Sequence, residues 1–280
     1  MRGRNLPTPR PEARSSIWVR RGLIAVVVLY VGGLILAPLA ALVTGAFQDG
    51  LVAAVQSVLQ PDALAAFGLT LWISLLVVII QAIFGTIIAW VIVRHRFRGQ
   101  RLLNALIDMP FAVSPVVVGY MLLLLFGRNG LLAPLLTAIN VRVAFAVPGM
   151  VLATLFVTLP FMIREIIPVL ESFDVQQEKA AATLGASGWQ IFWRITFPAL
   201  RWGFIYGLTL TFARALGEFG AVLVIGGGIQ GRTETATLFI YRALDERQYV
   251  SAYSAALLLG LFSLALVVGI DLRRRKMLRS

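Results

Sequence analysis

The sequence predicts an all-α, polytopic membrane protein with about six transmembrane helices, and three observations support this fold class. Of the 280 residues, 59% are hydrophobic and 14% are charged, whereas about 25% are charged in ordinary soluble domains. The mean hydropathy is +0.86. Apolar stretches long enough to cross a bilayer, which takes about 20 residues, recur along the whole chain.

Five uncharged apolar stretches and a sixth with two charges are the expected spans. The sixth, residues 202–225, contains Arg214 and Glu218, so it qualifies only if both charges are tolerated within it. Six spans place both termini on the same side of the membrane. The five uncharged stretches are residues 22–48, 63–93, 109–127, 143–163 and 248–270.

The basic residues predict which side that is. Nineteen of the 25 Lys and Arg residues lie in the tails 1–21 and 272–280 and in the connections 94–101 and 164–201. Because Lys and Arg concentrate in cytoplasmic loops, both tails are expected in the cytoplasm and the chain in the cytoplasmic (inner) membrane. The net charge of +12 then favours anionic membrane lipid, and not nucleic acid, as the partner of these charges.

Composition excludes several kinds of site. The chain has no cysteine and a single histidine, His95. Disulfides, cysteine redox sites and cysteine-ligated metals are therefore excluded, and a histidine metal site or a Ser-His-Asp triad is not expected. We expect neither a metal site nor catalytic residues in this chain.

Prolines interrupt the apolar stretches. Each proline removes a backbone donor and tends to kink its helix. The segment "DMPFAVSPVVVG", residues 108–119, holds two of them and is either an ordinary kink or a bend around a pathway. The prolines in or beside the spans are Pro38, Pro110, Pro115, Pro148 and Pro160.

The connection 164–201 has the pattern of a structured loop. Its stretch "EKAAATLGASGWQIFWRITFPAL", residues 178–200, is rich in helix formers and has aromatic residues at helical spacing. The glycines at 185 and 188 predict a turn between two short amphipathic helices, with Pro198 closing the second one. These helices are expected at the membrane surface, and the acidic residues of the connection, Glu178 among them, are expected to face solvent or a partner.

The spacing in this loop resembles the EAA loop of ABC-type importer permeases, which reads E-A-A-x3-G-x9-I-x-L-P. Two positions depart from that pattern: Lys179 stands where Glu is usual, directly after Glu178, and Phe197 replaces Leu. In that family the loop docks into a groove on a cytoplasmic ATPase, so residues 170–200 are the expected coupling loop. The residues carried over for this role are Glu178, Ala180, Ala181, Gly185, Ile195 and Pro198.

Further stretches resemble the sulfate/thiosulfate permease subunits of the CysW type. They include "IDMPFAVSPVVVG", "VPGMVLATLFVTLPFMIREIIPVLE" and "RALGEFGAVLVIGG". The resemblance implies the type I ABC importer transmembrane fold, with residues 63–271 as the permease core. It also implies transport of sulfate or thiosulfate by alternating access. Molybdate or tungstate transport remains an alternative, because those permeases carry versions of the "GEFG" segment.

The resemblance further implies a larger complex. The expected partners are a homologous sister permease, two ABC ATPase subunits and an extracytoplasmic sulfate-binding protein. The chain itself is expected to bind no cofactor, because ATP with Mg²⁺ would sit on the partner ATPase. Whether two permeases pair as a heterodimer or this chain pairs with itself stays open.

The stretch "GGGIQGRT", residues 226–233, comes close to a nucleotide-binding P-loop. It has Arg232 in place of Lys, lacks a strand-to-helix context and lies on the external side of the predicted topology. We expect a flexible external loop here. Its backbone N–H groups and Arg232 could briefly meet an oxyanion delivered by a binding protein, so Gly226, Gly231 and Arg232 are candidates for that contact.

Arg214 and Glu218 are four residues apart, so on one helix they can pair along the same face. One interpretation is a buried pair that locks this helix to its neighbours. The other is a charge that faces the translocation path, where Arg214 could attract an oxyanion. A different class of function, secondary oxyanion transport through this pair, is not favoured because the coupling loop indicates an ATPase partner.

Overall fold

The structure is a computed structural model that describes residues 15–277, and within that range all regular elements are helices, with no strand. The expected all-α fold class is thereby confirmed. The elements are α1 (Ser15–Ala46), α2 (Leu51–Val58), α3 (Pro61–Arg94), α4 (Gln100–Ala112), α5 (Pro115–Phe126), α6 (Ala133–Ala138), α7 (Val147–Ser172), α8 (Gln176–Thr183), α9 (Gly188–Ile191), the π-helix η1 (Phe192–Thr196), α10 (Phe197–Leu216), α11 (Gly220–Gly226), α12 (Ala236–Asp245) and α13 (Tyr249–Met277).

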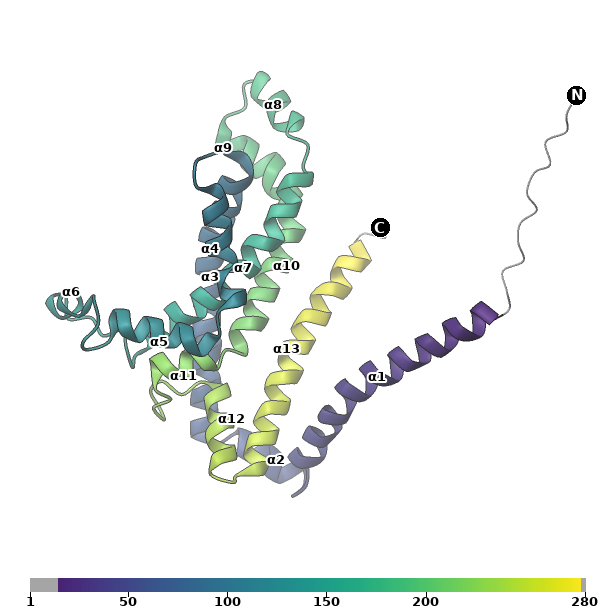
Figure 1. Ribbon diagram of the computed structural model, residues 1–280, viewed down its shortest axis with the longest axis vertical. Helices are drawn as coiled ribbons and strands as arrows, with labels where there is room; N and C mark the ends of the chain where they lie inside the picture. Colours follow the sequence, from purple (N-terminus) through teal and green to yellow (C-terminus); the bar gives the residue numbers. More distant parts are fainter. Residues whose placement is uncertain (1–14, 278–280) are drawn as a thin grey trace, which may run out of the picture.

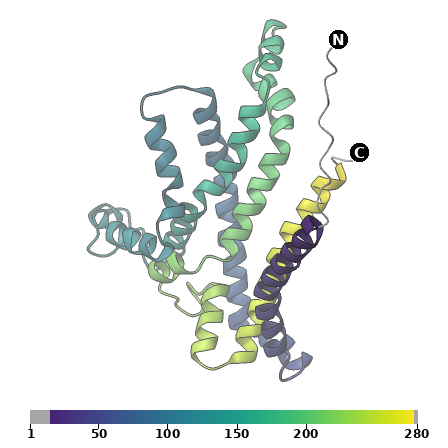
Figure 2. The ribbon, with the colours of Figure 1, turned by 45° about the vertical axis from the view of Figure 1, so that its right-hand side comes forward.

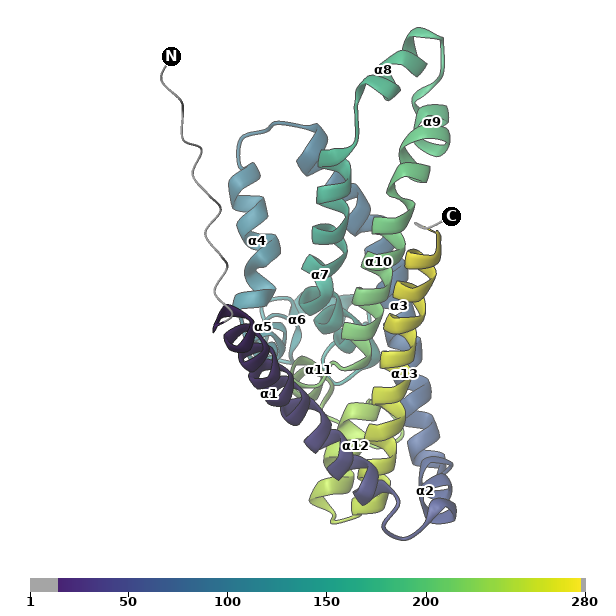
Figure 3. The same ribbon diagram turned by 90° about the vertical axis from the view of Figure 1, so that its right-hand side faces the viewer.

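The long helices run roughly along one axis. Helices α3, α7 and α10 pack together at the centre, and α13 lies beside α10 (Figure 1). Helix α1 diverges from the bundle toward its N-terminal end (Figure 1) and packs mainly on α13, across which it lies in Figure 2. The short helices α8 and α9 lie at one end of the molecule, and α2 and α12 lie at the opposite end (Figure 3). We call the first the coupling end and the second the distal end.

Four helices are long and apolar enough to cross a membrane singly, and six spans result if each of two bent helix pairs counts as one. The single spans are α1, α3, α7 and α13, which match the expected first, second, fourth and sixth spans. The bent pairs are α4 with α5, at 114°, and α10 followed by α11, at 57°. Both the third and the fifth spans are therefore broken, whereas the sequence indicated an interruption by proline only in the third.

The third span breaks at Pro115. Val113 and Ser114 have extended backbone conformations, with ψ values of 130° and 137°. Proline disfavours the helical conformation in the residue before it, so α4 ends at Ala112 and α5 begins at the proline itself. The bend expected in residues 108–119 is present, and α5 turns sideways out of the bundle (Figure 1).

Several helices extend beyond their expected ends. Helix α1 begins at Ser15, inside the expected tail 1–21, and α13 runs to Met277, inside the expected tail 272–280. Helix α7 runs on to Ser172. A helix satisfies its own backbone hydrogen bonds, so it can continue past the apolar stretch that predicts it. The tail residues 1–14 and 278–280 lie outside the described range.

The coupling loop contains one separate helix and not the expected two. Helix α8 stands apart, but α9, η1 and α10 form one continuous helix from Gly188 to Leu216. Pro198 therefore does not close a segment; it lies in the first turn of α10. Because proline cannot donate to the carbonyl four residues earlier, the turn before it widens into a π-helix, where Phe197 donates to the carbonyl of Phe192.

The centre of the bundle is close-packed through small residues. Met162 on α7 is fully buried, and a Cβ added at Gly85 on α3 or Gly207 on α10 would lie 2.9 or 2.8 Å from its side chain. Glycines on two helices thus let both backbones approach α7 closely, as is common in membrane helix packing. The surrounding core includes Ala89 and Ile166.

Candidate functional site

Glu178 fastens the coupling loop to α3. Its Oε1 accepts hydrogen bonds from Arg94 Nη2 at 2.9 Å and from Thr196 Oγ1 at 2.7 Å. The two charged side chains are only 13% and 16% exposed. The expectation that the Glu178 side chain faces solvent is therefore wrong. The carboxylate turns inward because a cation at the end of α3 and a buried hydroxyl of η1 both reach it.

Aromatic rings surround this contact. The guanidinium of Arg94 lies over Trp90 at 5.3 Å and over Phe173 at 5.7 Å from the ring centres. Trp90 meets Phe192 edge-to-face with ring centres 5.8 Å apart. Two rings this close to a guanidinium add cation–π attraction and help to exclude water from the ion pair. The pair is thus better shielded than an ordinary surface salt bridge.

The other expected coupling residues lie around α8. Ala180 is exposed and Ala181 half-buried, while Ile195 is half-buried in η1 and Pro198 exposed. Gly185 ends α8 with φ +85°, in the left-handed region. Its N–H bonds the carbonyl of Ala182, and the next N–H reaches back to Ala181. This is the Schellman arrangement that favours glycine after a helix, so the predicted glycine turn is present.

Lys179 has the opposite orientation to Glu178. Its side chain is exposed, and no residue of α8 is buried. Leu184, at the end of the helix, is exposed as well. The outer face of α8 therefore offers one cation and an apolar side chain, while the only acidic side chain of this helix is turned inward.

Arg214 and Glu218 form an ion pair, with Nη2 and Oε2 2.9 Å apart. The pair is not inside one continuous helix as assumed, because Glu218 lies in the break between α10 and α11. Its other oxygen, Oε1, accepts the N–H of Ala221 at 3.0 Å. Its own carbonyl accepts the hydroxyl of Thr237 on α12 at 2.7 Å. Glu218 thus holds together the broken ends of the fifth span.

The candidate external residues do not form one loop. Gly226 is the buried last residue of α11 and not part of a flexible segment, because Met150 packs against it. Gly231, at φ +70°, and Arg232 are exposed in the loop that follows. They border a cavity of about 100 Å³ beside Asp62 at the distal end. Only the last two thus remain available to meet a molecule from outside.

Another ion-pair cluster lies near this loop. Arg242 on α12 donates from Nε to Glu234 Oε1 at 2.6 Å and reaches Glu246 at 3.1 Å. The hydrogen bond to Glu234 raises the pKa of Arg242 above its ordinary value. Glu234 itself is almost fully buried, and Arg242 supplies its counter-charge.

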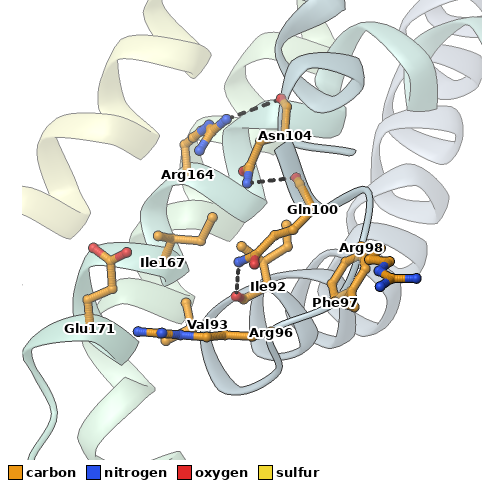
Figure 4. A pocket seen from close by; sticks show the side chains of 10 residues that line it. All are labelled: Ile92, Val93, Arg96, Phe97, Arg98, Gln100, Asn104, Arg164, Ile167 and Glu171. Atoms are coloured by element: carbon orange, nitrogen blue, oxygen red, sulfur yellow. Dashed lines mark hydrogen bonds between the residues drawn. The ribbon is translucent and has the colours of Figure 1, made fainter. Parts of the chain in front are cut away.

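The coupling end contains a cavity of about 760 Å³ between α3, α4 and α7 (Figure 4). Arg96 and Arg98 border it from the α3–α4 connection, and Arg164 borders it from α7. Arg164 is held in place by Asp108 on α4, to which Nε and Nη2 donate at 2.8 and 2.5 Å. This two-bond contact between Arg164 and Asp108 connects α7 to α4 beside the 114° bend.

Sequence reasoning missed the partners of these charges. The pattern of basic residues accounts for Arg94 and Arg164 by topology alone, and it assigns no role to Thr196 or Asp108. One signal was present: Arg94 and Arg164 each lie at the end of an apolar stretch, where a charge is either snorkelling or paired. Their acidic partners are far along the chain, so spacing alone could not identify them.

Comparisons with known proteins agree with this architecture. The family model described as "Binding-protein-dependent transport system inner membrane component" matches residues 81–277. The chain is 47% identical over 246 residues to the sulfate transport system permease protein CysW of Synechococcus elongatus, covering 88% of this chain and 86% of that protein. It is 43% identical over 255 residues to CysW of Escherichia coli K12, covering 91% and 88%.

A solved structure shows the same fold. It is a bacterial alginate ABC transporter in complex with an alginate pentasaccharide-bound periplasmic protein. One of its chains superimposes with a TM-score of 0.78 at 17% identity, over 94% of this chain and 96% of that one. At this identity the match establishes the ABC importer permease fold and nothing about the substrate.

Proposed function

The chain belongs to the family of binding-protein-dependent transport system inner membrane components, and we propose that it is the membrane-spanning permease of an ATP-driven sulfate or thiosulfate importer. The observation that carries this proposal is the likeness to sulfate permeases along nearly the whole chain. Molybdate or tungstate is not favoured, because both of these relatives are sulfate permeases.

In this proposal the coupling end faces the cytoplasm. The basic connections 94–101 and 164–201 both lie there, and Lys and Arg concentrate on the cytoplasmic side. Both termini of the chain are then cytoplasmic. The distal end faces outward, where α12 and the loop with Gly231 and Arg232 would receive a sulfate-binding protein. The alginate transporter in its complex with a periplasmic protein is a precedent for such an encounter.

The chain would work as one subunit of a larger complex. Helix α8 and the residues around it would dock on an ABC ATPase, and ATP with Mg²⁺ would bind that partner and not this chain. A homologous sister permease would complete the pathway, and two ATPase copies would bind at the cytoplasmic coupling end. The permease has no catalytic role in this scheme; it alternates between outward and inward access as the ATPase pair closes and opens.

The Arg214–Glu218 pair is proposed to hold the broken fifth span in shape. Three features support this role: the 2.9 Å contact, the near-complete burial of Glu218, and its hydrogen bonds to α11 and α12. The exposed part of Arg214, 29% of its side chain, is the part that could attract a passing oxyanion. The structural role is favoured because both charges are already neutralised by each other.

Uptake in a strain that lacks its own sulfate transport tests the proposal. Cells that carry this chain with its sister permease, ATPase and binding protein should accumulate labelled sulfate at low external concentration. Omission of the ATPase should abolish uptake. Uptake that persists without the ATPase would instead indicate a secondary transporter, and uptake of molybdate without sulfate would refute the substrate assignment.

The composition of the complex can be measured separately. Affinity purification through this chain should recover a second permease and two ATPase copies for each pair of permeases. Recovery of two copies of this chain and no second permease would replace the heterodimer with a homodimer. Exchange of Arg232 for Gln should weaken uptake at low sulfate if the external loop meets the arriving anion.

A further inference from the structure

Helix α8 is attached to the bundle mainly by polar contacts. No residue of α8 is buried, so it has little apolar packing to fix its position. Its inward side chain is Glu178, which meets both Arg94 at the end of α3 and Thr196 in η1. One carboxylate oxygen therefore joins α8 both to nearby η1 and to α3, whose Arg94 is 84 residues away in the sequence.

Several features of this contact restrict its geometry. A charge-assisted hydrogen bond is stronger and more directional than a neutral one, and the rings of Trp90 and Phe173 cover the guanidinium. Thr196 is fully buried. Movement of α8 relative to α3 would stretch a shielded ion pair and leave charge in a poorly hydrated place, which is costly.

The two elements that Glu178 contacts lead directly into the bundle. Arg94 is the last residue of α3, and η1 continues without a break into α10. Helices α3 and α10 both pack against α7 at the centre. A displacement of α8 is therefore delivered to two of the three central helices through one side chain.

We propose that Arg94, Glu178 and Thr196 form a coupling latch, through which movement of the docked α8 is passed to α3 and α10. Glu178 is thus a positioning residue inside the permease and not a docking contact with the ATPase. Docking falls to the exposed outer face of α8, with Lys179 and Leu184. This inference rests on the proposed function, because it needs an ATPase that moves α8.

The latch makes a specific kinetic prediction. If it only docked the ATPase, its loss would reduce complex formation, hydrolysis and uptake together. If it transmits movement, the ATPase should still bind and hydrolyse ATP while uptake falls. The number of ATP molecules hydrolysed for each sulfate imported therefore separates transmission from docking.

The experiment uses the complete transporter in proteoliposomes with its binding protein. Glu178→Gln keeps the size of the side chain and an acceptor for Thr196 but removes the charge that holds Arg94. We expect the ATPase to co-purify in normal amount and the ATP consumed per sulfate to rise about tenfold. Asp49→Asn is the matched control, because it removes an exposed carboxylate from the turn that follows α1, far from the coupling loop, and should leave the ratio unchanged.

Two further variants complete the test. Thr196→Val leaves the ion pair but deletes the hydroxyl, and should raise the ratio less than Glu178→Gln does. Arg94→Glu combined with Glu178→Arg reverses the pair and should restore part of the coupling that either single change loses. If Glu178→Gln prevents assembly, Thr196→Val measures the ratio instead.

The outcomes are distinct. An unchanged ratio in Glu178→Gln, or a parallel loss of hydrolysis and uptake that follows the amount of complex, would overturn the latch. Both results require that the unmodified complex imports sulfate. If the unmodified complex hydrolyses ATP but imports no sulfate, the proposed function fails. The latch is then tested by the stimulation of ATP hydrolysis by the binding protein. Stimulation in Glu178→Gln that equals stimulation in the parent would overturn the latch.

Discussion

Removal of Arg214 should destabilise the permease through the charge it leaves behind. Glu218 is only 2% exposed, so in Arg214→Leu its carboxylate stays in a poorly hydrated break without a counter-charge. Breaking a buried pair by removing one partner costs about 3–5 kcal/mol. Arg214 retains 29% exposure, and water that reaches it weakens the pair, so we expect the lower end, about 3 kcal/mol.

Replacement of Glu218, the other member of the pair, by Gln should reduce stability less than Arg214→Leu does. Glu218→Gln removes the buried charge itself but keeps an oxygen that can accept the N–H of Ala221, so α11 keeps its cap. Glu218→Ala removes the cap as well, which adds about 1 kcal/mol. The combination of Arg214→Leu with Glu218→Gln leaves no charge in the break. It should therefore be more stable than Arg214→Leu alone, although it carries two changes.

The assay is unfolding of the purified complex in detergent, monitored by helical circular dichroism as denaturant is added. A double-mutant cycle on the four proteins isolates the interaction between the two side chains. A double variant that is less stable than Arg214→Leu by the full effect of Glu218→Gln would show no coupling between the residues and would refute this reasoning. Uptake should follow assembly; variants that assemble normally but do not transport would place Arg214 in the pathway.

Three further changes test other parts of the structure. Gly207→Val puts a side chain against buried Met162 and should cost about 2 kcal/mol from overpacking, whereas Gly32→Ala on the exposed α1 should be neutral; equal melting temperatures for the two would contradict the close packing of α10 on α7. Gly185→Ala meets open space but a φ of +85°, so thermal unfolding should show a loss of about 1 kcal/mol from backbone strain alone, and a stabilised protein would contradict the left-handed turn. Arg242→Gln leaves buried Glu234 unpaired and should lower the melting temperature more than Arg232→Gln, whose side chain is exposed.

The number of spans could be predicted from the sequence because it depends on a local property. A stretch such as 63–93 is apolar along its whole length, and any such stretch must bury itself in lipid or protein. The breaks were harder to place. Pro115 predicted a bend, but the direction of α5 after it is set by packing against α11, which no local pattern contains.

In the candidate site, too, features that depend on local sequence could be predicted and contacts between distant residues could not. The pairing of Arg214 with Glu218 follows from a spacing of four residues, and it is present even though the helix ends between them. The turn at Gly185 likewise follows from a local backbone requirement. The contact of Glu178 with Arg94 could not be predicted, because the two residues are 84 positions apart in the sequence.

These pairs share a position that bears on how the molecule can move. Glu218 lies at the break in the fifth span, Asp108 and Arg164 lie beside the bend of the third, and Glu178 lies where the coupling loop meets α3 and η1. Close-packed helix interiors move as rigid bodies, so a change of access must occur at such junctions. An ion pair there resists small fluctuations, yet it can exchange partners when a larger force is applied, which apolar packing cannot do without opening a cavity. The charged residues that first looked out of place in an apolar chain are therefore found where rigid segments are joined.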